Sequence, residues 1–388
     1  MLASVIFVTL LAQVLLYPGI ADLVEALGAT TDLDASMWFL AAEFAAFICF
    51  AGVWGAVSDR FSRRVPFIAL GALGGATGYL ILVALPVFGE VTFGHVLAVR
   101  VFQGAATIGA FSLAITMLMD LDGGHGRNMG AAGIAIGSGT ALGSPIGGQL
   151  SLLGPLVPLL AAAACFLLLL PLLALVRDRA PPSNRPGFRR VVADTLGTPS
   201  LGLPFAFGFV DRLTAGFMAL VGVFYFREIF DLDPGQTGLM LLLFFGPFAL
   251  LQYPFGRVSD RIGRFIPVVG GSACYGGSIL IVGLTPTLET TAVSMLIVGI
   301  FGAMVSPATM ALVTDLADDT RRGSAMAGFN VFGSLGFLTG ILLGGTIAGS
   351  FGFLTAFALI GSMEILIAVA AIPFFRRLSL PGPTSVTG

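Results

Sequence analysis

Long apolar runs recur along the whole of this sequence, separated by short polar breaks. Because a helix needs about 20 consecutive apolar residues to cross a bilayer, each run predicts one membrane-spanning helix. Only 10% of the 388 residues are charged, against about 25% in a typical soluble protein. The first run has no basic leader and no A-x-A cleavage site, so we interpret it as a permanent span. The twelve predicted spans are residues 2–26, 36–57, 66–88, 94–118, 128–151, 155–176, 200–226, 235–256, 266–285, 290–314, 324–348 and 353–375.

Arginine placement predicts how these spans are oriented. The sequence contains no lysine, and 16 of its 19 basic residues fall in loops on one side of the predicted membrane. The loops on the other side carry only Arg227, beside a group of acidic residues. Arginine-rich loops stay in the cytoplasm, so both termini are expected there. The expected location is the inner, or cytoplasmic, membrane of the cell.

Several classes of protein are excluded by residues that the chain lacks. Without lysine there is neither a retinal Schiff base nor a P-loop. The motifs H-E-x-x-H and G-x-S-x-G are absent, so an enzyme is not expected. No basic tail is present to bind nucleic acid, and neither histidine has metal-ligand spacing to a partner. The three cysteines lie in apolar runs and predict no disulfide.

The two halves of the chain repeat one another. The string GAVSDRFSRR begins at Gly55, and GRVSDRIGRF begins at Gly256, 201 residues later. Glycines four residues apart in the fifth span recur in the eleventh. A Pro- and Arg-rich stretch separates the copies and is typical of a linker. The fold prediction is an all-α membrane protein whose 12 transmembrane helices form two pseudo-symmetric six-helix bundles. The predicted domains are an N-terminal bundle (1–176), a cytoplasmic linker (177–199), a C-terminal bundle (200–377) and a short tail (378–388).

Three motifs carry a resemblance to the major facilitator superfamily of transporters. The two repeated strings resemble the family's loop signature G-x-x-x-D-R-x-G-R-R/K, with Ser62 in place of the second glycine in the first copy. LAVRVFQGAA, which begins at Leu97, is similar to the family's R-x-x-Q-G signature. GTALGSPIGG, which begins at Gly139, resembles the antiporter signature G-x-x-x-G-P-x-x-G-G, with Pro145 one place late. The resemblance covers essentially the whole chain and points to the drug:H+ antiporter branch.

The resemblance implies that the repeated loop is a gating latch. Its arginines can pair with acidic residues at neighbouring cytoplasmic helix ends, and such pairs break when the two halves rock. The alternative is a tight turn whose arginines only satisfy the positive-inside rule. The candidate latch residues are Gly55, Asp59, Arg60, Arg64, Asp120, Gly256, Asp260, Arg261, Arg264 and Asp315.

Two glycine ladders place a bare helix face where another helix can approach closely. This packing either allows sliding between conformations or is static, and the sequence leaves both open. The candidate packing residues are Gly139, Gly143, Pro145, Gly147 and Gly148 in the fifth span and Gly336, Gly340 and Gly344 in the eleventh.

Charged residues inside spans are costly, at roughly 2.5–3.5 kcal/mol on insertion scales, so each needs a reason. Asp211 and Arg212 lie near the middle of the seventh span, where Asp211 is a candidate proton carrier modulated by Arg212; the alternative is a buried structural ion pair. The resemblance suggests proton coupling for Arg100, which could instead tie helices together. Glu43 could pair with Arg100, or its carboxylate could simply be exposed to water on the outer side of the membrane.

Other intramembrane polar groups receive weaker interpretations. Glu364, deep in the last span, is interpreted as a structural carboxylate that faces the bundle. Asp22 is interpreted as solvated at the outer end of the first span. The candidate substrate-cavity residues are Gln13, Tyr17, Gln103, Phe217, Tyr225, Phe245, Gln252 and Asn330.

We therefore expect a secondary active transporter that works by alternating access and exports small lipophilic or amphiphilic compounds in exchange for protons. The alternatives are an uncoupled facilitator, a proton-coupled importer of a small metabolite, and a membrane receptor or scaffold on a transporter fold. The expected partners are a small-molecule substrate, protons or Na+, and the lipid bilayer. No cofactor, metal ion or nucleic acid is expected, and the protein is expected to be a monomer.

Overall fold

Every regular element in the described part of the chain is a helix. The computed structural model describes residues 1–29, 32–88, 92–119, 125–178, 199–318 and 322–377, without the side chains of residues 119, 125–130, 323, 324 and 377. Ten helical stretches in these residues are long and apolar enough to cross a membrane. The two remaining predicted spans correspond to the shorter helix α1 (Leu2–Val14) and to α6 (His125–Leu153). The predicted all-α fold class with twelve spans is therefore confirmed.

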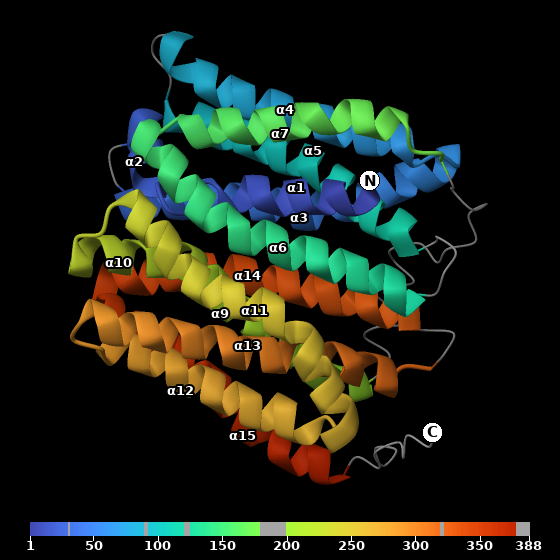
Figure 1. The fold of residues 1–388 in the computed structure, drawn as a ribbon, viewed down its shortest axis with the longest axis vertical. Helices are drawn as coiled ribbons and strands as arrows, with labels where there is room; N and C mark the ends of the chain where they lie inside the picture. The colour runs from blue at the N-terminus through green and yellow to red at the C-terminus, as the bar shows by residue number, and fades with distance from the viewer. Residues whose placement is uncertain (30–31, 89–91, 120–124, 179–198, 319–321, 378–388) are drawn as a thin grey trace. The chain divides into compact units, whose positions relative to one another are not determined.

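Contacts divide the chain into two compact units. Unit 1 consists of Met1–Arg185 together with Val223–Leu242. Within it, α1 packs against α6 and α4 packs against α7, so the first span meets the fifth and the third meets the sixth (Figure 1). The other helices of unit 1 are α2 (Ile20–Ala26), α3 (Asp32–Phe61), α4 (Val65–Ala84), α5 (Phe93–Met119), α7 (Val157–Ala174), α10 (Val223–Phe230) and the first part of α11 (Pro234–Ile262).

Unit 2 consists of Pro186–Gly222 and Leu243–Gly388. Its helix pairs repeat those of unit 1, because α9 packs against α14 and α12 packs against α15. Segment 223–242, predicted from sequence to belong to the C-terminal bundle, therefore makes its contacts in unit 1. The helices of unit 2 are α9 (Gly202–Phe217), the remainder of α11, α12 (Gly271–Leu284), α13 (Leu288–Leu316), α14 (Arg322–Phe351) and α15 (Phe353–Arg377).

The first span is not one continuous helix, as 2–26 was predicted to be. Helix α1 ends at Val14 and α2 begins at Ile20. The intervening Leu16 and Tyr17 amides donate to carbonyls three residues back, so the helix tightens into turns. Pro18 has no amide hydrogen to continue the helical ladder, which explains the break.

Helix α11 begins where its sequence supplies a complete N-terminal cap. The amide of Gln236 donates to Asp233 Oδ1 at 2.8 Å, and Gln236 Oε1 accepts from the amide of Asp233 at 3.1 Å. Pro234 occupies the first helical position, where a missing amide hydrogen costs nothing. This capping box fixes the start of the helix that carries the second copy of the repeated loop.

Two spans contain π-helical segments. Residues Met218–Gly222 are π-helical between α9 and α10, and Ile266–Gly270 are π-helical before α12. Such segments are rare and are often found at functional sites. The first of them ends where the chain passes from unit 2 into unit 1.

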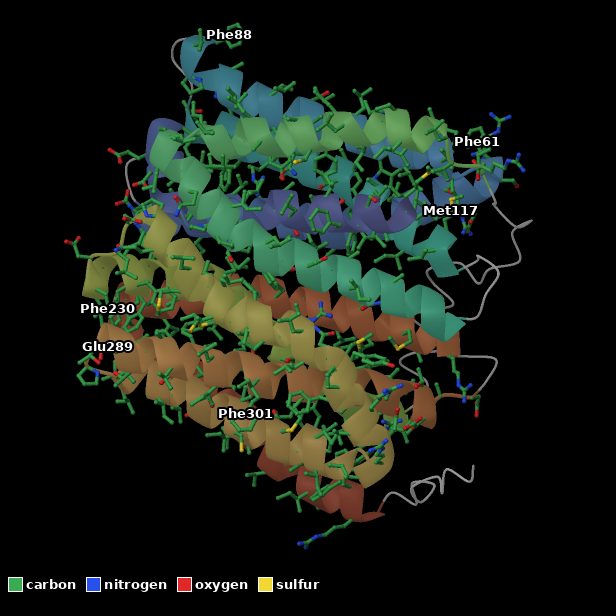
Figure 2. All side chains as sticks on the ribbon, viewed as in Figure 1. Phe61, Phe88, Met117, Phe230, Glu289 and Phe301 are labelled. Carbon is green, nitrogen blue, oxygen red and sulfur yellow. The ribbon has the colours of Figure 1, made fainter. Side chains whose placement is uncertain are left out.

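Large apolar side chains cover the outer surface of each unit. Leu168 is 69% exposed, Leu250 is 78% exposed and Leu366 is 67% exposed, all on long apolar helices. Exposed apolar side chains in this number are typical of a surface that faces lipid. In unit 1, Phe61 and Met117 lie toward one end of the bundle and Phe88 lies at the other, as an up-and-down course requires (Figure 2). The chain is thus a multi-pass integral membrane protein.

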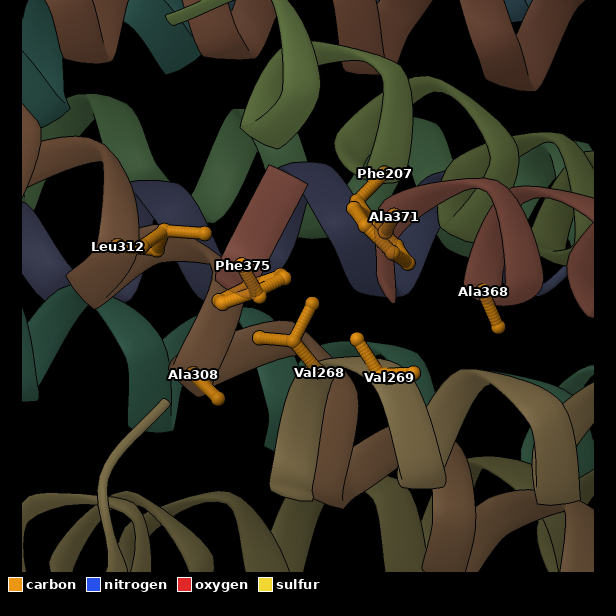
Figure 3. Close-up of a cluster of buried hydrophobic side chains, with 8 residues drawn as sticks. All are labelled: Phe207, Val268, Val269, Ala308, Leu312, Ala368, Ala371 and Phe375. Carbon is orange, nitrogen blue, oxygen red and sulfur yellow. The ribbon is translucent and has the colours of Figure 1, made fainter. Parts of the chain in front are cut away.

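An apolar cluster joins four elements of unit 2. Phe207 of α9 meets side chains from the π-helical segment 266–270, from α13 and from α15 (Figure 3). None of these side chains is more than 7% exposed. The cluster joins the ends of α9 and α15 that were predicted to be cytoplasmic to α13 and to the π-helical segment before α12. Its members are Phe207, Val268, Val269, Ala308, Leu312, Ala368, Ala371 and Phe375.

Candidate functional site

A buried polar network lies at the centre of unit 1. Arg100 of α5 forms an ion pair with Glu43 of α3, and neither side chain is more than 1% exposed. Arg100 also donates to Gln103 Oε1 and to the carbonyl of Phe39, and its guanidinium lies 4.1 Å from the centre of the Phe39 ring. Gln103 in turn donates to Glu43 Oε1 at 3.2 Å. The structure therefore brings together three of the predicted site residues.

Small residues on neighbouring helices make room for this network. A Cβ atom at Gly104 would lie 2.7 Å from the carbonyl oxygen of Glu43, so α5 and α3 approach closely there. A Cβ atom at Gly78 would press on the side chain of Gln103. Tyr17 is buried within electrostatic range of Glu43 and Arg100. The paired charges and hydrogen bonds compensate for the cost of burying an arginine in this core.

Asp211 has no such partner among the described residues of unit 2. It lies on α9 with its side chain 4% exposed, and its Oδ1 atom is buried without a hydrogen-bond partner. Among the described residues, no ion pair within 4.0 Å joins Asp211 to the half-buried Arg212. The two side chains are successive residues of a helix and point about 100° apart. The predicted alternative of a direct ion pair between them is therefore not what the geometry contains.

A second buried carboxylate lies near Asp211. Glu364 of α15 is 1% exposed and accepts hydrogen bonds from Thr214 Oγ1 at 3.0 Å and from Ser272 Oγ at 2.6 Å. Thr214 lies one helical turn after Asp211 on α9, and Tyr275 of α12 is within electrostatic range of both carboxylates. Sequence reasoning treated Glu364 as a structural group only. Its one signal was an acid within an apolar span, because its partners are 150 and 92 residues away in the sequence.

The glycine ladders lie at close helix contacts. A Cβ atom at Gly336 would overlap the carbonyl oxygen of Phe209, and one at Gly340 would overlap that of Leu213, so α14 lies directly on the backbone of α9. The corresponding contacts in unit 1 are between α6 and α1. There the overlaps would be Gly139 with the carbonyl of Phe7, Gly143 with the side chain of Val14 and Gly147 with the carbonyl of Leu15. Gly344 faces the ring of Phe217.

The C-terminal part of the antiporter-like motif also contacts the start of α11. A Cβ atom at Gly148 would overlap the carbonyl oxygen of Pro234, and Ser144 and Pro145 pack against Gly238. Both contacts are made by the start of α11, inside unit 1. The motif thus contacts α1 through one face and segment 223–242 through another.

The second repeated loop contains a charge network. Arg264 Nη1 donates to Asp260 Oδ1 at 2.7 Å, and Arg264 Nε donates to Asp315 Oδ2 at 2.8 Å. Partial burial lowers the pKa of Arg264, but the hydrogen bonds and negative charges of Asp315 and Asp260 outweigh it and raise the pKa overall. Gly263 occupies the turn with φ of 83°. Arg261 is exposed, and Gly256 packs loosely near Pro307.

The first repeated loop uses different contacts. The backbone amide of Arg64 donates to both oxygens of Asp178 at 3.1 and 2.9 Å, at the start of α4. Ser62 adopts the left-handed conformation, with φ of 49°, that Gly263 adopts in the second loop. Asp59 is half-buried and Arg60 is exposed, while a Cβ atom at Gly55 would meet nothing within 4 Å. Asp120 lies outside the described residues. The latch role of both loops stays a prediction.

The predicted cavity residues are divided between the two units, and their role stays a prediction. Gln13, Tyr17 and Gln103 are buried in unit 1, and Gln13 Nε2 has no hydrogen-bond partner. Phe217 is packed edge-on against Phe357 in unit 2. In unit 1, Tyr225 contacts Phe226 and Phe230. In unit 2, Phe245 contacts Phe244, Gln252 is half-buried and Asn330 is exposed.

Asp22 is ion-paired rather than simply solvated, which corrects its sequence interpretation. Arg227 Nη2 of α10 donates to Asp22 Oδ1 of α2 at 2.8 Å. The pair is partly open to its surroundings, with the Asp22 side chain 38% exposed and that of Arg227 21% exposed. Both residues belong to unit 1, so the pair helps to fix segment 223–242 there.

Comparisons with known proteins agree on one family. The sequence profile of the Major Facilitator Superfamily matches residues 2–226 and 205–387. An uncharacterized MFS-type transporter of Methanocaldococcus jannaschii is 33% identical over 165 residues, which cover 42% of this chain and 42% of that relative's own length.

Solved structures share the fold. A bacterial homolog of the human lysosomal transporter Spinster, in an inward-facing and occupied conformation, matches with a TM-score of 0.79 at 14% identity, over 97% of this chain and 96% of that chain. The human organic anion transporter MFSD10 matches with a TM-score of 0.66 at 21% identity, over 95% and 98%. At these identities the likeness concerns the fold alone.

Proposed function

The chain belongs to the major facilitator superfamily, a family of membrane transporters and not of enzymes, and from this premise we propose that it is a proton-coupled secondary transporter. Its substrates would be small lipophilic or amphiphilic compounds, exported in exchange for protons by alternating access. It would act as a monomer in the cytoplasmic membrane. Neither a cofactor nor a nucleic acid enters this proposal.

The observation that carries the proposal is the state of Asp211. Its carboxyl group is buried in an apolar helix, and Oδ1 has no hydrogen-bond partner. An intramembrane carboxyl group without a partner is costly and calls for a functional reason. Binding and releasing a proton is the simplest one, since it switches the group between neutral and charged forms.

The Glu43–Arg100 network plays a different part in this proposal. Each charge there already has an opposite charge and a hydrogen-bonded Gln103. A paired carboxylate gains little from a proton, whereas an unpaired one gains much. We assign Asp211 to proton binding, with Arg212 as a nearby positive charge. Glu43 and Arg100 then hold α3 against α5 and bias the coupling indirectly.

Flux under an imposed pH gradient tests this function. Purified protein in liposomes would be given ethidium, a lipophilic fluorescent cation, with the interior either acidic or alkaline. Antiport predicts ethidium accumulation in acid-interior vesicles, because protons leave as the dye enters. Asp211→Asn should reduce this accumulation to nearly that of empty vesicles.

The matched control is Asp34→Asn, which removes an exposed carboxylate at the start of α3. It should transport like the parent. Accumulation in alkaline-interior vesicles would instead indicate a proton-coupled importer, and equal exchange without a gradient would indicate a facilitator. Gradient-driven accumulation by Asp211→Asn at the parent's level would refute the assignment of Asp211.

A further inference from the structure

Glu364 is surrounded by rotatable hydroxyl groups. Its two carboxyl oxygens contact Thr214 Oγ1 of α9 at 3.0 Å and Ser272 Oγ of α12 at 2.6 Å. Among the described residues no arginine donates to it, in contrast to Glu43, which has Arg100 as its partner. A carboxyl group held only by hydroxyls is not fixed in its charged form.

Each hydroxyl also has a second acceptor close by. Thr214 Oγ1 lies 3.3 Å from the carbonyl oxygen of Val210, and Ser272 Oγ lies 3.4 Å from the carbonyl oxygen of Glu364 itself. When Glu364 is ionised, both hydroxyls can donate to its carboxylate. When Glu364 is protonated, its O–H can donate to Ser272, whose own hydrogen can turn to the Glu364 carbonyl. Both forms are therefore hydrogen-bonded without any movement of the backbone.

The charged and titratable groups that face Glu364 come from two helices. Asp211 of α9 acts on it electrostatically. Tyr275 of α12 interacts electrostatically with both acids and with Arg212. Helix α14, which also packs against α15, has no charged residue after Arg322. Two buried negative charges repel, so the pair favours holding one proton.

Close helix packing and apolar side chains surround Glu364 and Asp211. Gly276 of α12 and Gly361 of α15 meet backbone to backbone, since a Cβ atom at either would lie within 2.7 Å of the other's carbonyl oxygen. This approach places Glu364 directly over Ser272. Four residues before Asp211, four before Ser272 and four after Glu364 lie Phe207, Val268 and Ala368, which belong to the apolar cluster of Figure 3. Water is thereby excluded on that side of the acids.

We infer that Glu364 is a second proton-binding residue. It holds a proton between Thr214 and Ser272, and its electrostatic interaction with Asp211 favours one proton on the pair. One proton enters, converts the carboxylate to a neutral carboxylic acid, and leaves in the reverse step. The use of this proton in transport rests on the proposed function, but the presence of the site does not.

Infrared difference spectroscopy tests the site without any substrate. Spectra of the full-length protein in liposomes at acid and alkaline pH differ by the C=O stretching bands of carboxyl groups that take up protons. We expect one band to be lost in Glu364→Gln. We expect the same band to persist at a shifted frequency in Ser272→Ala, because one hydrogen bond to the carboxyl group is removed.

A transport assay and a titration with Na+, added to the difference spectra, distinguish the ways in which the inference can fail. If Glu364→Gln leaves the difference spectrum unchanged, Glu364 is not a proton site, even if ethidium transport is proton-driven. If the band titrates but no pH gradient drives transport, the site stands and the proposed function fails. If added Na+ shifts the carboxylate bands of Glu364 while acid produces no C=O band, a sodium site replaces the proton site.

The inference can be tested even if Glu364→Gln impairs folding. Glu364→Gln keeps the shape of the side chain, and its unfolding temperature and elution volume in detergent would be compared with those of the parent. Should it fail to fold, Thr214→Val and Ser272→Ala each leave Glu364 in place. A titrating band whose frequency moves in both variants supports the inference, and a spectrum identical to the parent's in both overturns it.

Discussion

At the scale of single residues, the buried acids Glu43 and Glu364 differ in what compensates their charge. Glu43 has a guanidinium and an amide as partners. Glu364 has two hydroxyls. Charge neutralisation by Arg100 leaves Glu43 suited to stabilising the fold, whereas hydroxyl partners leave Glu364 able to change protonation state. The same residue type thus serves two purposes according to its neighbours.

The Glu43–Arg100 pair yields a stability prediction. Arg100→Met should lower the free energy of unfolding by about 3–5 kcal/mol, because it leaves a buried carboxylate without its partner. The double variant Glu43→Gln/Arg100→Met should lose markedly less, since no charge remains buried. Unfolding by SDS in mixed micelles measures both. Equal losses in the single and double variants would contradict the idea that the uncompensated charge is the cause.

At the scale of helices, close backbone contact is the feature that organises each unit. Glycine ladders bring α14 onto α9 and α6 onto α1. These contacts follow the spacing that the sequence displays. The same spacing occurs whether the contact is static or slides during transport, so the sequence alone could not separate the two.

Gly336→Ala tests this contact. The added methyl group would overlap the carbonyl oxygen of Phe209, which cannot yield without moving α9. We expect a loss of about 1–3 kcal/mol in the free energy of unfolding. Gly277→Ala is the matched control, because a Cβ atom there meets nothing within 4 Å. Equal stability of the two variants would mean that the α9–α14 contact accommodates an added methyl group.

Sequence patterns predicted the spans well and the site incompletely, for physical reasons. Apolar length alone determines whether a helix can cross a bilayer, so the twelve segments could be read directly. The break near Pro18 was missed because an apolar run of 25 residues conceals a turn. The partners of Glu364 could not be predicted, since they depend on how α9, α12 and α15 pack. The Arg100 partnership with Glu43 was open in the sequence and is present in the structure.

At the scale of the whole molecule, one segment that lies between stretches of unit 2 in the sequence packs in unit 1. Residues 223–242 follow and precede stretches of unit 2, yet they pack within unit 1. The contacts include the Asp22–Arg227 ion pair and the overlap positions at Gly148 and Gly238. Thr237 in this segment is fully buried.

Opening of segment 223–242 from unit 1 can be measured by cysteine labelling. In a variant whose three native cysteines are replaced, Thr237→Cys should react slowly with a maleimide because the side chain is buried. Adding Asp22→Asn should speed the reaction by up to about fivefold, which corresponds to an exposed ion pair of at most about 1 kcal/mol.

The charge-exchanged variant Asp22→Arg/Arg227→Asp is the control for this labelling. It should return the rate toward that of Thr237→Cys alone, because the attraction is restored with the signs reversed. High salt should mimic Asp22→Asn in the parent. A rate that responds to neither salt nor charge exchange would mean that the ion pair does not hold the segment.

Segment 223–242 also constrains the order in which the contacts of unit 1 can form during synthesis. Unit 1 remains unfinished until the ribosome has passed residue 242, because Ser144, Pro145 and Gly148 lack their neighbours until then. The two halves, expressed as separate fragments divided in the 177–199 stretch, would therefore leave the first with an uncovered face that the second alone can fill.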